Sequence, residues 1–240
     1  MQAFLPAAGL GTRLRPFTND RPKALVEVQG RTLLELAIGR LTRLGVSRIV
    51  VNVHHYADQV EAFLHSRDWD TEVRVSDERA QLMDTGGGLK QAASLFAPDE
   101  PILIHNVDIL SHIDLGMMVR QHIDSMSFAT LAASRRDTSR QLLFDSRGQL
   151  VGWTNRSNGE YRWSRQPVDD CEALAFSGIA IVDPQLLGCL PAATHPYSII
   201  PAYLDIAKNH RISYFLHTAA DWLDVGKTES LNQAQQWKLS

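Results

Sequence analysis

The sequence has few cysteines and no long apolar segment. Cys171 and Cys189 are its two cysteines in 240 residues. They are too few for a disulfide framework, and neither lies in a CxxC or Cys/His metal-binding spacing. We expect both to be reduced, mostly buried thiols. No window approaches the roughly 20 apolar residues that a membrane-spanning helix needs, so we expect no membrane partner.

The charges nearly balance, with a formal net charge of −3 from 24 basic and 27 acidic residues. Such a chain has no general basic field, which argues against nucleic acid as a partner and leaves anion binding to a local site. The chain begins without the basic and apolar regions of a secretory leader. We therefore expect a cytoplasmic protein that acts on small molecules. The 44% hydrophobic and 21% charged fractions suit a single globular domain of this length.

Short apolar runs alternate with amphipathic stretches through the first half of the chain. The runs include QAFLPA, RIVVNV, EVRVSD and PILIHNVD, and the stretches between them include LLELAIGRLTRLG, ADQVEAFLHS and GGGLKQAASLF. This order is typical of an α/β fold with a doubly wound, mostly parallel sheet. Residues 33–44 predict a helix that ends at Gly45, before a strand over residues 48–53.

The pattern changes after Ser134. RQLLFD-SRG-QLVGW predicts a β-hairpin, and the following TNRSNGEYRWSRQPVDDC is polar, irregular and rich in turn residues. We interpret residues 135–172 as a lid or insertion. ALAFSGIAIV, YSIIPAYLDIAKN, RISYFLH and DWLDVG then predict further strands and a helix, with a last helix from Lys227. The single domain, residues 1–240, thus divides into halves 1–134 and 135–240.

A glycine turn follows the first predicted strand, in LPAAGLGTRLRP. Gly9 and Gly11 have no side chains to keep phosphate oxygens away from backbone N–H groups, so the turn suits an anion. A dinucleotide-binding GxGxxG needs a third glycine where Leu14 stands, and its second strand would end in a ribose-binding acid rather than near His54. GxxxxGK[ST] occurs nowhere in the sequence, which excludes a Walker P-loop.

The longer stretch GLGTRLRPFTNDRPKALVEVQG resembles the signature of sugar-phosphate nucleotidyltransferases, GxGTRLxPxTxxxPKxLxxVxG. DTGGGL, the acid that closes PILIHNVD, AFSGIAIV and WLDVG follow in the family's order. The resemblance covers nearly all the chain. It implies a nucleotidyltransferase fold, a nucleoside triphosphate and a sugar 1-phosphate as partners, and Mg²⁺ as cofactor.

The resemblance also implies roles for individual residues. The nucleotide-binding residues are Ala7, Ala8, Gly9, Gly11, Thr12, Arg13, Lys23, Gly86 and Gly87. The catalytic residues are Arg13, Lys23 and Asp108, and the metal ligands are Asp108 and Asp224. The sugar-phosphate-binding residues are Asn155, Ser177 and Gly178.

Three further details of the resemblance bear on the substrates. TGGG at residues 85–88 resembles the motif of uridylyltransferases at this place, whereas guanylyltransferases more often show GTAG. This favours UTP as the substrate, with residues 81–88 as the wall of the base site. The family's usual NGD is Asn106-Val107-Asp108 here. GWTN at residues 152–155 stands near the usual place of the family's EKP element, which leaves the identity of the sugar open.

The implied reaction is an in-line attack of a sugar 1-phosphate oxygen on the α-phosphorus of the triphosphate, with expulsion of pyrophosphate. A phosphate monoester has a second pKa of about 6, so the nucleophile needs no protein base at neutral pH. Catalysis then reduces to positioning and charge stabilisation. The Arg13 guanidinium suits the charge of the leaving pyrophosphate, and the Lys23 ammonium suits a bridge between two phosphates. Asp108 and Asp224 each follow a short apolar stretch, so we expect both at strand ends, where carboxylates can hold Mg²⁺.

Alternatives stay open at this point. One is a guanylyltransferase that acts on mannose or heptose 1-phosphate, and another is a non-catalytic regulatory module that keeps the fold. Asp108 could cap a helix in place of Asp114, and Asp224 could be a turn acid before Gly226. The glycines at 86–88 suit either a closely packed helix start or contact with a flat base.

Overall fold

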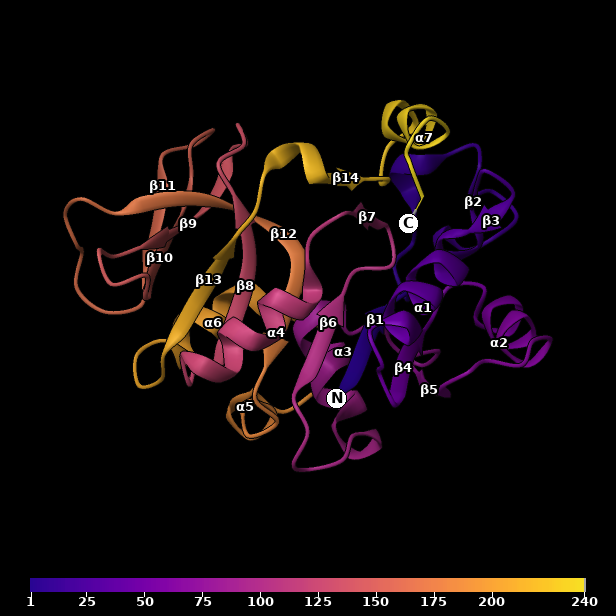
Figure 1. Cartoon of the computed structure of the whole chain (residues 1–240), viewed down its shortest axis with the longest axis horizontal. Helices are drawn as coiled ribbons and strands as arrows, with labels where there is room; N and C mark the ends of the chain where they lie inside the picture. The colour runs from indigo at the N-terminus through magenta and orange to yellow at the C-terminus, as the bar shows by residue number, and fades with distance from the viewer. Residues whose placement is uncertain (240) are drawn as a thin grey trace.

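Four parallel strands form one half of the main sheet. In this computed structural model, which describes residues 1–239, β1 (Gln2–Pro6) lies between β4 (Arg48–Val53) and β6 (Ile102–His105), and β5 (Glu72–Asp77) pairs with β4. Each of these strands matches one of the apolar runs in the sequence. The parallel half confirms the predicted α/β architecture and brings the carboxyl ends of β1, β4 and β6 to one edge (Figure 1).

The second half extends the same sheet with mainly antiparallel strands. β12 (Glu172–Val182) runs antiparallel to β6, and it also pairs with β8 (Ala129–Ser134) and β9 (Arg140–Phe144). The outer strands are β10 (Leu150–Asn155), β11 (Glu160–Trp163) and β13 (Ile212–Leu216), which completes a ten-stranded sheet. The predicted hairpin is β9–β10. The expectation of irregular chain after it was wrong in part, because β11 pairs with β10 and buries part of Trp163.

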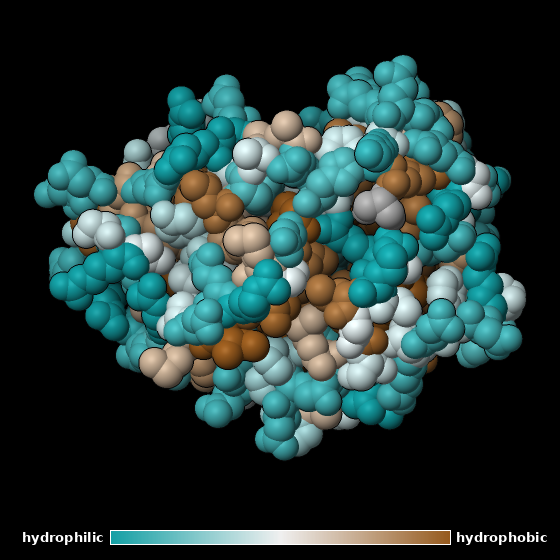
Figure 2. All heavy atoms as spheres, viewed as in Figure 1, coloured by the Kyte–Doolittle hydropathy of each residue, from teal (hydrophilic) through white to brown (hydrophobic). Residues whose placement is uncertain are grey.

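Helices cover both faces of the sheet. One face carries α1 (Leu33–Arg43), α2 (Ala57–His65), α4 (Leu115–Asp124) and α7 (Thr228–Ala234), and the other carries α3 (Asp84–Gln91), α5 (Leu186–Cys189) and α6 (Ile199–Ile206) (Figure 1). Successive residues of β1 point to opposite faces, so Phe4 belongs to one apolar core and Leu5 to the other. Figure 2 shows hydrophilic groups over most of the outer surface and apolar groups near the middle of the view.

Side chains cap the starts of two helices, and a glycine follows the end of one of them. The Thr32 Oγ1 accepts a hydrogen bond from the Glu35 N–H at the start of α1, and Asp114 accepts one from the Met117 N–H at the start of α4. Asp114 is thus the helix cap that competed with Asp108 in the sequence, which leaves Asp108 available for another role. Gly45 follows α1 with a φ of 83°, a left-handed conformation that glycine adopts readily.

Two small sheets complete the fold. β2 (Glu27–Val28) pairs with β3 (Arg31–Thr32), and β7 (Ile109–Ser111) pairs with β14 (Trp222–Asp224). The β7–β14 pair joins chain segments from the two halves of the sequence, and Figure 1 shows it between these two halves. Among the described residues, no helix has the length and apolarity to cross a bilayer.

The expectation that both cysteines are mostly buried was wrong. Cys189 is exposed at the end of α5, and Cys171 is only partly buried before β12. Both are free thiols, as expected. Burial of a thiol depends on which side of a loop or short helix faces the core, and short loops carry no periodic pattern that reveals this side.

We expect Leu5→Ala to lower the free energy of unfolding by about 2–5 kcal/mol, because Leu5 is fully buried in the central strand and its loss leaves a cavity. Urea denaturation of both proteins measures the difference. Met117→Ala is the control, since that side chain is 52% exposed on α4, and its effect should stay within about 0.5 kcal/mol. Equal effects of the two substitutions would contradict the assigned core.

Candidate functional site

The glycine turn follows the carboxyl end of β1 and forms an open backbone loop. Gly11 has a φ of 65°, and a Cβ there would lie 3.1 Å from both Lys23 Cβ and Thr18 Cγ2. The Thr18 hydroxyl donates to the Gly11 carbonyl at 2.9 Å, which closes the turn. Glycine is therefore required at position 11 both by its conformation and by the close approach of Lys23.

Three successive N–H groups in this turn have no partner in the protein. Within residues 1–239, the backbone N–H groups of Gly9, Leu10 and Gly11 donate no hydrogen bond. Gly9 and Leu10 are exposed. Successive N–H groups that face one space form an anion-binding concavity. Three free N–H groups in a row suit an anion, and the binding of phosphate by this turn stays a prediction.

The two residues before this turn are held by a buried network. The Asn52 Oδ1 on β4 accepts hydrogen bonds from the N–H groups of Ala7 and Ala8, at 2.6 and 3.2 Å. The Asn52 Nδ2 donates to Glu78, whose other carboxylate oxygen accepts from the Met83 N–H at 3.0 Å. The N–H groups of Ala7 and Ala8 are therefore occupied by protein, and these residues shape the turn instead of presenting free donors.

Sequence reasoning missed Asn52 and Glu78. Both side chains are almost fully buried, and burial raises the pKa of Glu78 despite its hydrogen bonds to Met83 and Asn52. The available signal was a polar residue inside the apolar run RIVVNV, since a buried amide needs partners. The network ties the glycine turn to the segment that leads into α3.

Asp108 and Asp224 come together through the pairing of β7 with β14. Asp224 is the last residue of β14 and stands opposite Ile109, the residue after Asp108. The Val225 N–H donates to the Asp108 carbonyl at 2.8 Å, which extends this pairing by one residue. Two acids that are 116 positions apart in the sequence (224 − 108) therefore lie side by side.

Lys23 supplies the cation next to these acids. Its ammonium donates a hydrogen bond to Asp108, and the two side chains are only 15% and 12% exposed. Burial by itself would raise the pKa of Asp108, but the adjacent ammonium outweighs burial and holds that pKa below its usual range. Burial and the Asp108 carboxylate raise the pKa of Asp224. The group holds two carboxylates against one ammonium, so it favours a further positive charge.

Gly226 leaves the space in which this group meets Arg13. A Cβ at position 226 would lie 2.6 Å from Asp224 Oδ1, 3.0 Å from Arg13 Nη2 and 3.4 Å from Asp108 Oδ2. The Gly226 N–H also donates to Asp224 Oδ1 at 2.8 Å. Arg13 is exposed and forms no ion pair within the described residues. Its guanidinium is therefore free to bind an anion beside the two carboxylates.

The carboxylates of Asp108 and Asp224 are oxygen ligands that fit Mg²⁺ as nucleotide-dependent enzymes bind it. Mg²⁺ binds through one or two carboxylates, with waters and substrate phosphates as the other ligands. Asp108 and Asp224 are two such carboxylates, and they lie side by side. In residues 1–239 no cluster of three or more His, Cys, Asp or Glu side chains is arranged to hold a metal. The fit therefore requires a phosphate ligand as well.

One cavity of about 530 Å³ collects most of these groups. Of the predicted residues, Ala8, Gly9, Arg13, Lys23 and Asp108 line it. The lining also includes Leu82, Asp84 and Thr85, and four residues that sequence reasoning did not assign, Pro6, Asn52, Asn106 and Pro196. Leu82, Asp84 and Thr85 belong to the segment expected to form the wall of the base site.

The glycines at 86–88 face protein rather than this cavity. The N–H groups of Gly86 and Gly87 donate to the Tyr197 carbonyl at 3.0 and 3.2 Å. A Cβ at Gly86 would lie 2.5 Å from the Tyr197 ring, and one at Gly88 would lie 2.5 Å from Glu78. These glycines let α3 pack closely on its neighbours, and a direct contact with nucleotide stays a prediction for Gly86 and Gly87.

The residues predicted to bind the sugar phosphate lie in the second half. Ser177 is buried in β12, and Gly178 beside it has a φ of 72° and would place a Cβ 2.8 Å from Asn106 Nδ2. Gly178 thus supports a residue of the cavity. Asn155 ends β10, where its side chain accepts from the Ser157 N–H at 3.2 Å. Asn155 is absent from the residues that line the cavity, and its role stays a prediction.

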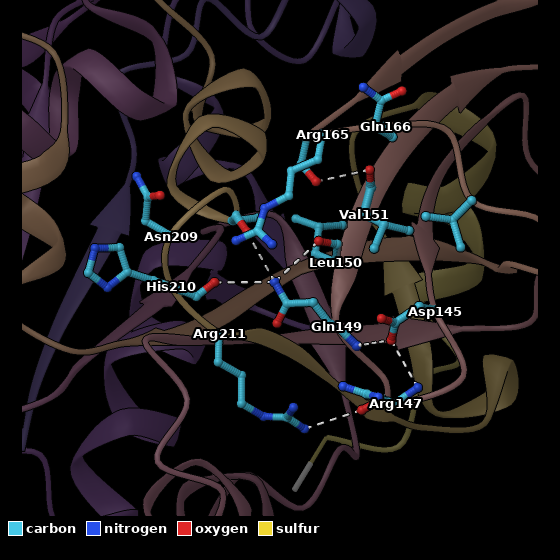
Figure 3. Close-up of a pocket in the computed structure, with 13 residues that line it drawn as sticks. Asp145, Arg147, Gln149, Leu150, Val151, Arg165, Gln166, Asn209, His210 and Arg211 are labelled. Atoms are coloured by element: carbon cyan, nitrogen blue, oxygen red, sulfur yellow. Dashed lines mark hydrogen bonds between the residues drawn. The ribbon is translucent and has the colours of Figure 1, made fainter.

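A second cavity of about 550 Å³ lies between the β9–β10 hairpin and the segment before β13 (Figure 3). Its polar side chains mostly bind the protein itself. Gln149 Nε2 donates to the His210 carbonyl at 3.2 Å, and Arg211 Nη2 donates to the Arg147 carbonyl at 3.3 Å. None of the residues that the sequence assigned to chemistry lines this cavity. The cavity with Lys23 and Asp108 is therefore the candidate site.

We expect Gly226→Ala to lower the turnover of the nucleotidyl transfer by at least about 100-fold, because the added methyl group displaces Arg13 and Asp224 from each other. Steady-state pyrophosphate release measures this effect. Gly188→Ala is the matched control, since nothing lies within 4 Å of a Cβ at that position. Wild-type turnover in the Gly226 variant would show that this space has no part in the reaction.

Comparison with known proteins agrees with this geometry. The family model described as "Nucleotidyl transferase" matches residues 3–142. The chain is 33% identical to the N-acetylmuramate alpha-1-phosphate uridylyltransferase of Caulobacter vibrioides over 95% of this chain and 93% of that one. It is 28% identical to the protein of the same name from Neisseria meningitidis, over 98% and 97% of the two chains.

The fold also matches solved structures. The UDP-glucose pyrophosphorylase of Acinetobacter baumanii superposes with a TM-score of 0.78 at 15% identity, over 98% of this chain and 91% of that one. At this identity the likeness concerns the fold alone. The family match, by contrast, covers more than half of the sequence and includes Arg13, Lys23 and Asp108. From these matches and the arrangement of its site, the chain belongs to the nucleotidyl transferase family.

Proposed function

We propose that this chain transfers a uridylyl group from UTP to a sugar 1-phosphate and releases pyrophosphate, with N-acetylmuramic acid 1-phosphate as the sugar substrate. The observation that carries the proposal is one cavity lined by Gly9, Arg13, Lys23 and Asp108, with Asp224 beside Asp108. The names of the two uridylyltransferases reported above support the choice of base and sugar. The reaction would take place in the cytoplasm.

The glycine turn is suited to the triphosphate. The free N–H groups of Gly9, Leu10 and Gly11 offer three donors for phosphate oxygens. Thr12 and Arg13 follow in the same loop, and the exposed guanidinium of Arg13 can donate two parallel hydrogen bonds to phosphate. Leu82, Asp84 and Thr85 form the neighbouring wall of the cavity, where the base would lie. Residues 1–134 would thus bind the nucleotide.

Residues 135–240 would bind the sugar phosphate, with 135–172 as a lid. Ser177 and Gly178 of this half reach the cavity through Asn106, which lines it, and the Asn106 N–H donates to the Gly178 carbonyl at 2.9 Å. β12 carries both residues and pairs directly with β6. The sugar phosphate would therefore approach from the side of β12, opposite the glycine turn.

Charge stabilisation and alignment account for the chemistry. The sugar phosphate oxygen attacks the α-phosphorus in line, and the bond to the pyrophosphate oxygen breaks. Lys23 would lie between the two substrates and would exchange its contact with Asp108 for phosphate oxygens. Arg13 would stabilise the charge that moves onto the leaving pyrophosphate. Mg²⁺ held by Asp108 and Asp224 would neutralise phosphate charge.

We expect Asp108→Asn and Asp224→Asn each to lower Mg²⁺-dependent turnover by at least about 100-fold, because each removes a metal-binding charge at nearly constant volume. Pyrophosphate release over a range of Mg²⁺ concentrations measures the loss. Asp114→Asn is the control, since asparagine also caps helices and Asp114 lies outside the cavity. Turnover within about threefold of wild type in both site variants would refute the metal assignment.

We expect UTP to be used at least tenfold better than GTP, a difference of about 1.4 kcal/mol in transition-state stabilisation. The reason is that a site built to hydrogen-bond one base leaves its polar groups unpaired with another. The measurement is kcat/KM for UTP, GTP, dTTP and CTP, with N-acetylmuramic acid 1-phosphate and mannose 1-phosphate as acceptors. A tenfold preference for GTP would instead identify a guanylyltransferase, and no turnover with any pair would favour a regulatory module.

A further inference from the structure

Arg136 lies two residues after the end of β8 and packs against β12 and β14. Its guanidinium carbon stands 3.8 Å from the centre of the Trp222 ring, a cation–π contact. Nη1 donates to Ser134 Oγ at 3.1 Å and to Ser177 Oγ at 3.0 Å, and Nη2 donates to the Phe176 carbonyl at 2.5 Å. The guanidinium is thus held rigidly beside Ser177, in the half of the chain proposed to bind the sugar.

The charge of Arg136 has no counter-ion. Among the described residues, Arg136 forms no ion pair, although its side chain is only partly exposed. A guanidinium has five N–H groups, and the three contacts use three of them, so two donors stay available. Burial lowers the pKa of Arg136 to about 10 and Asp224 opposes this shift, so the group stays charged at neutral pH.

His217 and Ser177 complete a neutral environment around this cation. The His217 Nδ1 contacts the Thr218 carbonyl at 2.8 Å, so that nitrogen carries the proton and Nε2 can accept. The Ser177 hydroxyl then donates to His217 Nε2 at 2.7 Å and accepts from Arg136. Burial lowers the pKa of His217, which keeps the ring neutral beside the guanidinium. Ser177 and a neutral His217 therefore supply no negative charge to balance Arg136.

A partly buried cation without a counter-ion is costly unless a ligand supplies the charge. Asp224, the carboxylate that acts on Arg136 electrostatically, belongs to the group with Lys23. The segment GWTN at residues 152–155, in the same half of the chain, contains no Lys or Arg. We propose that Arg136 binds the anionic part of the sugar substrate and is a specificity-determining residue of the reaction. This inference rests on the proposed function.

Two groups on the sugar could supply the anion. Every sugar 1-phosphate carries a phosphate, and N-acetylmuramic acid 1-phosphate also carries a lactyl carboxylate. N-acetylglucosamine 1-phosphate is the same sugar without the lactyl group. Both anions accept two parallel hydrogen bonds from a guanidinium, which is the geometry that the two free donors of Arg136 allow. A comparison of the two sugars therefore distinguishes the two sources.

The experiment uses the full chain, with UTP and each of these two sugar phosphates in turn. We expect Arg136→Gln to raise the KM for the sugar phosphate at least tenfold, the loss of about one charged hydrogen bond, and to leave the KM for UTP within about twofold. Arg136→Lys should recover part of the affinity, because it keeps the charge but not the planar fork. Arg135→Gln is the matched control. That neighbouring side chain is 68% exposed and paired with Glu172, so both KM values should stay unchanged.

Calorimetric titration of each sugar phosphate into wild type and Arg136→Gln provides a readout that needs no turnover. An equal loss for both sugars would assign Arg136 to the phosphate, and a loss confined to N-acetylmuramic acid 1-phosphate would assign it to the carboxylate. Unchanged affinity for both sugars, or a loss that falls on UTP, would overturn the inference. If wild type turned over neither sugar, the proposed function would fail, while the titrations would still decide the role of Arg136.

Discussion

The side-by-side placement of two buried carboxylates is the constraint on which the rest of the site depends. Asp108 and Asp224 repel each other in a region of low exposure, and the Lys23 ammonium compensates only one of the two charges. The β7–β14 pairing holds the backbones together against this repulsion. The site thus has a built-in deficit of positive charge, which a divalent cation can fill when phosphates bring the remaining ligands.

The charged group lies apart from the apolar central strands that support it. The central strands β1, β4 and β6 are apolar on both faces, and polar side chains appear where these strands end. Asn52 is the exception, since it lies within β4 and binds the chain on both sides. Through Asn52 and Glu78, the glycine turn and the start of α3 are held by one network. A shift of either segment would therefore leave buried polar groups unpaired.

The second half of the chain contributes both structure and charge. β12 continues the sheet from β6, so the half of the chain proposed to bind the sugar is joined to the half proposed to bind the nucleotide by backbone hydrogen bonds. Arg136, Trp222 and Ser177 form a rigid group on this side. Lys23 contacts Asp108, and Arg13 lies near both aspartates beside Gly226, so cations and carboxylates gather in one region. This arrangement suits a reaction in which two phosphate-bearing substrates must approach each other.

The sequence by itself determined the parallel half of the fold and the identity of the chemistry. Strands at residues 48–53 and 72–77 follow from their apolar pattern, and the glycine turn with Arg13 and Lys23 is a local motif whose function depends on neighbouring residues. The resemblance assigned Asp108 and Asp224 to one metal, but only the tertiary structure shows how they meet, through a strand pairing across 116 positions (224 − 108). The contacts of Asn52, Glu78 and Arg136 also come from the tertiary structure alone. Their partners are distant in sequence, and a single buried polar residue does not reveal which distant donor or acceptor it will meet.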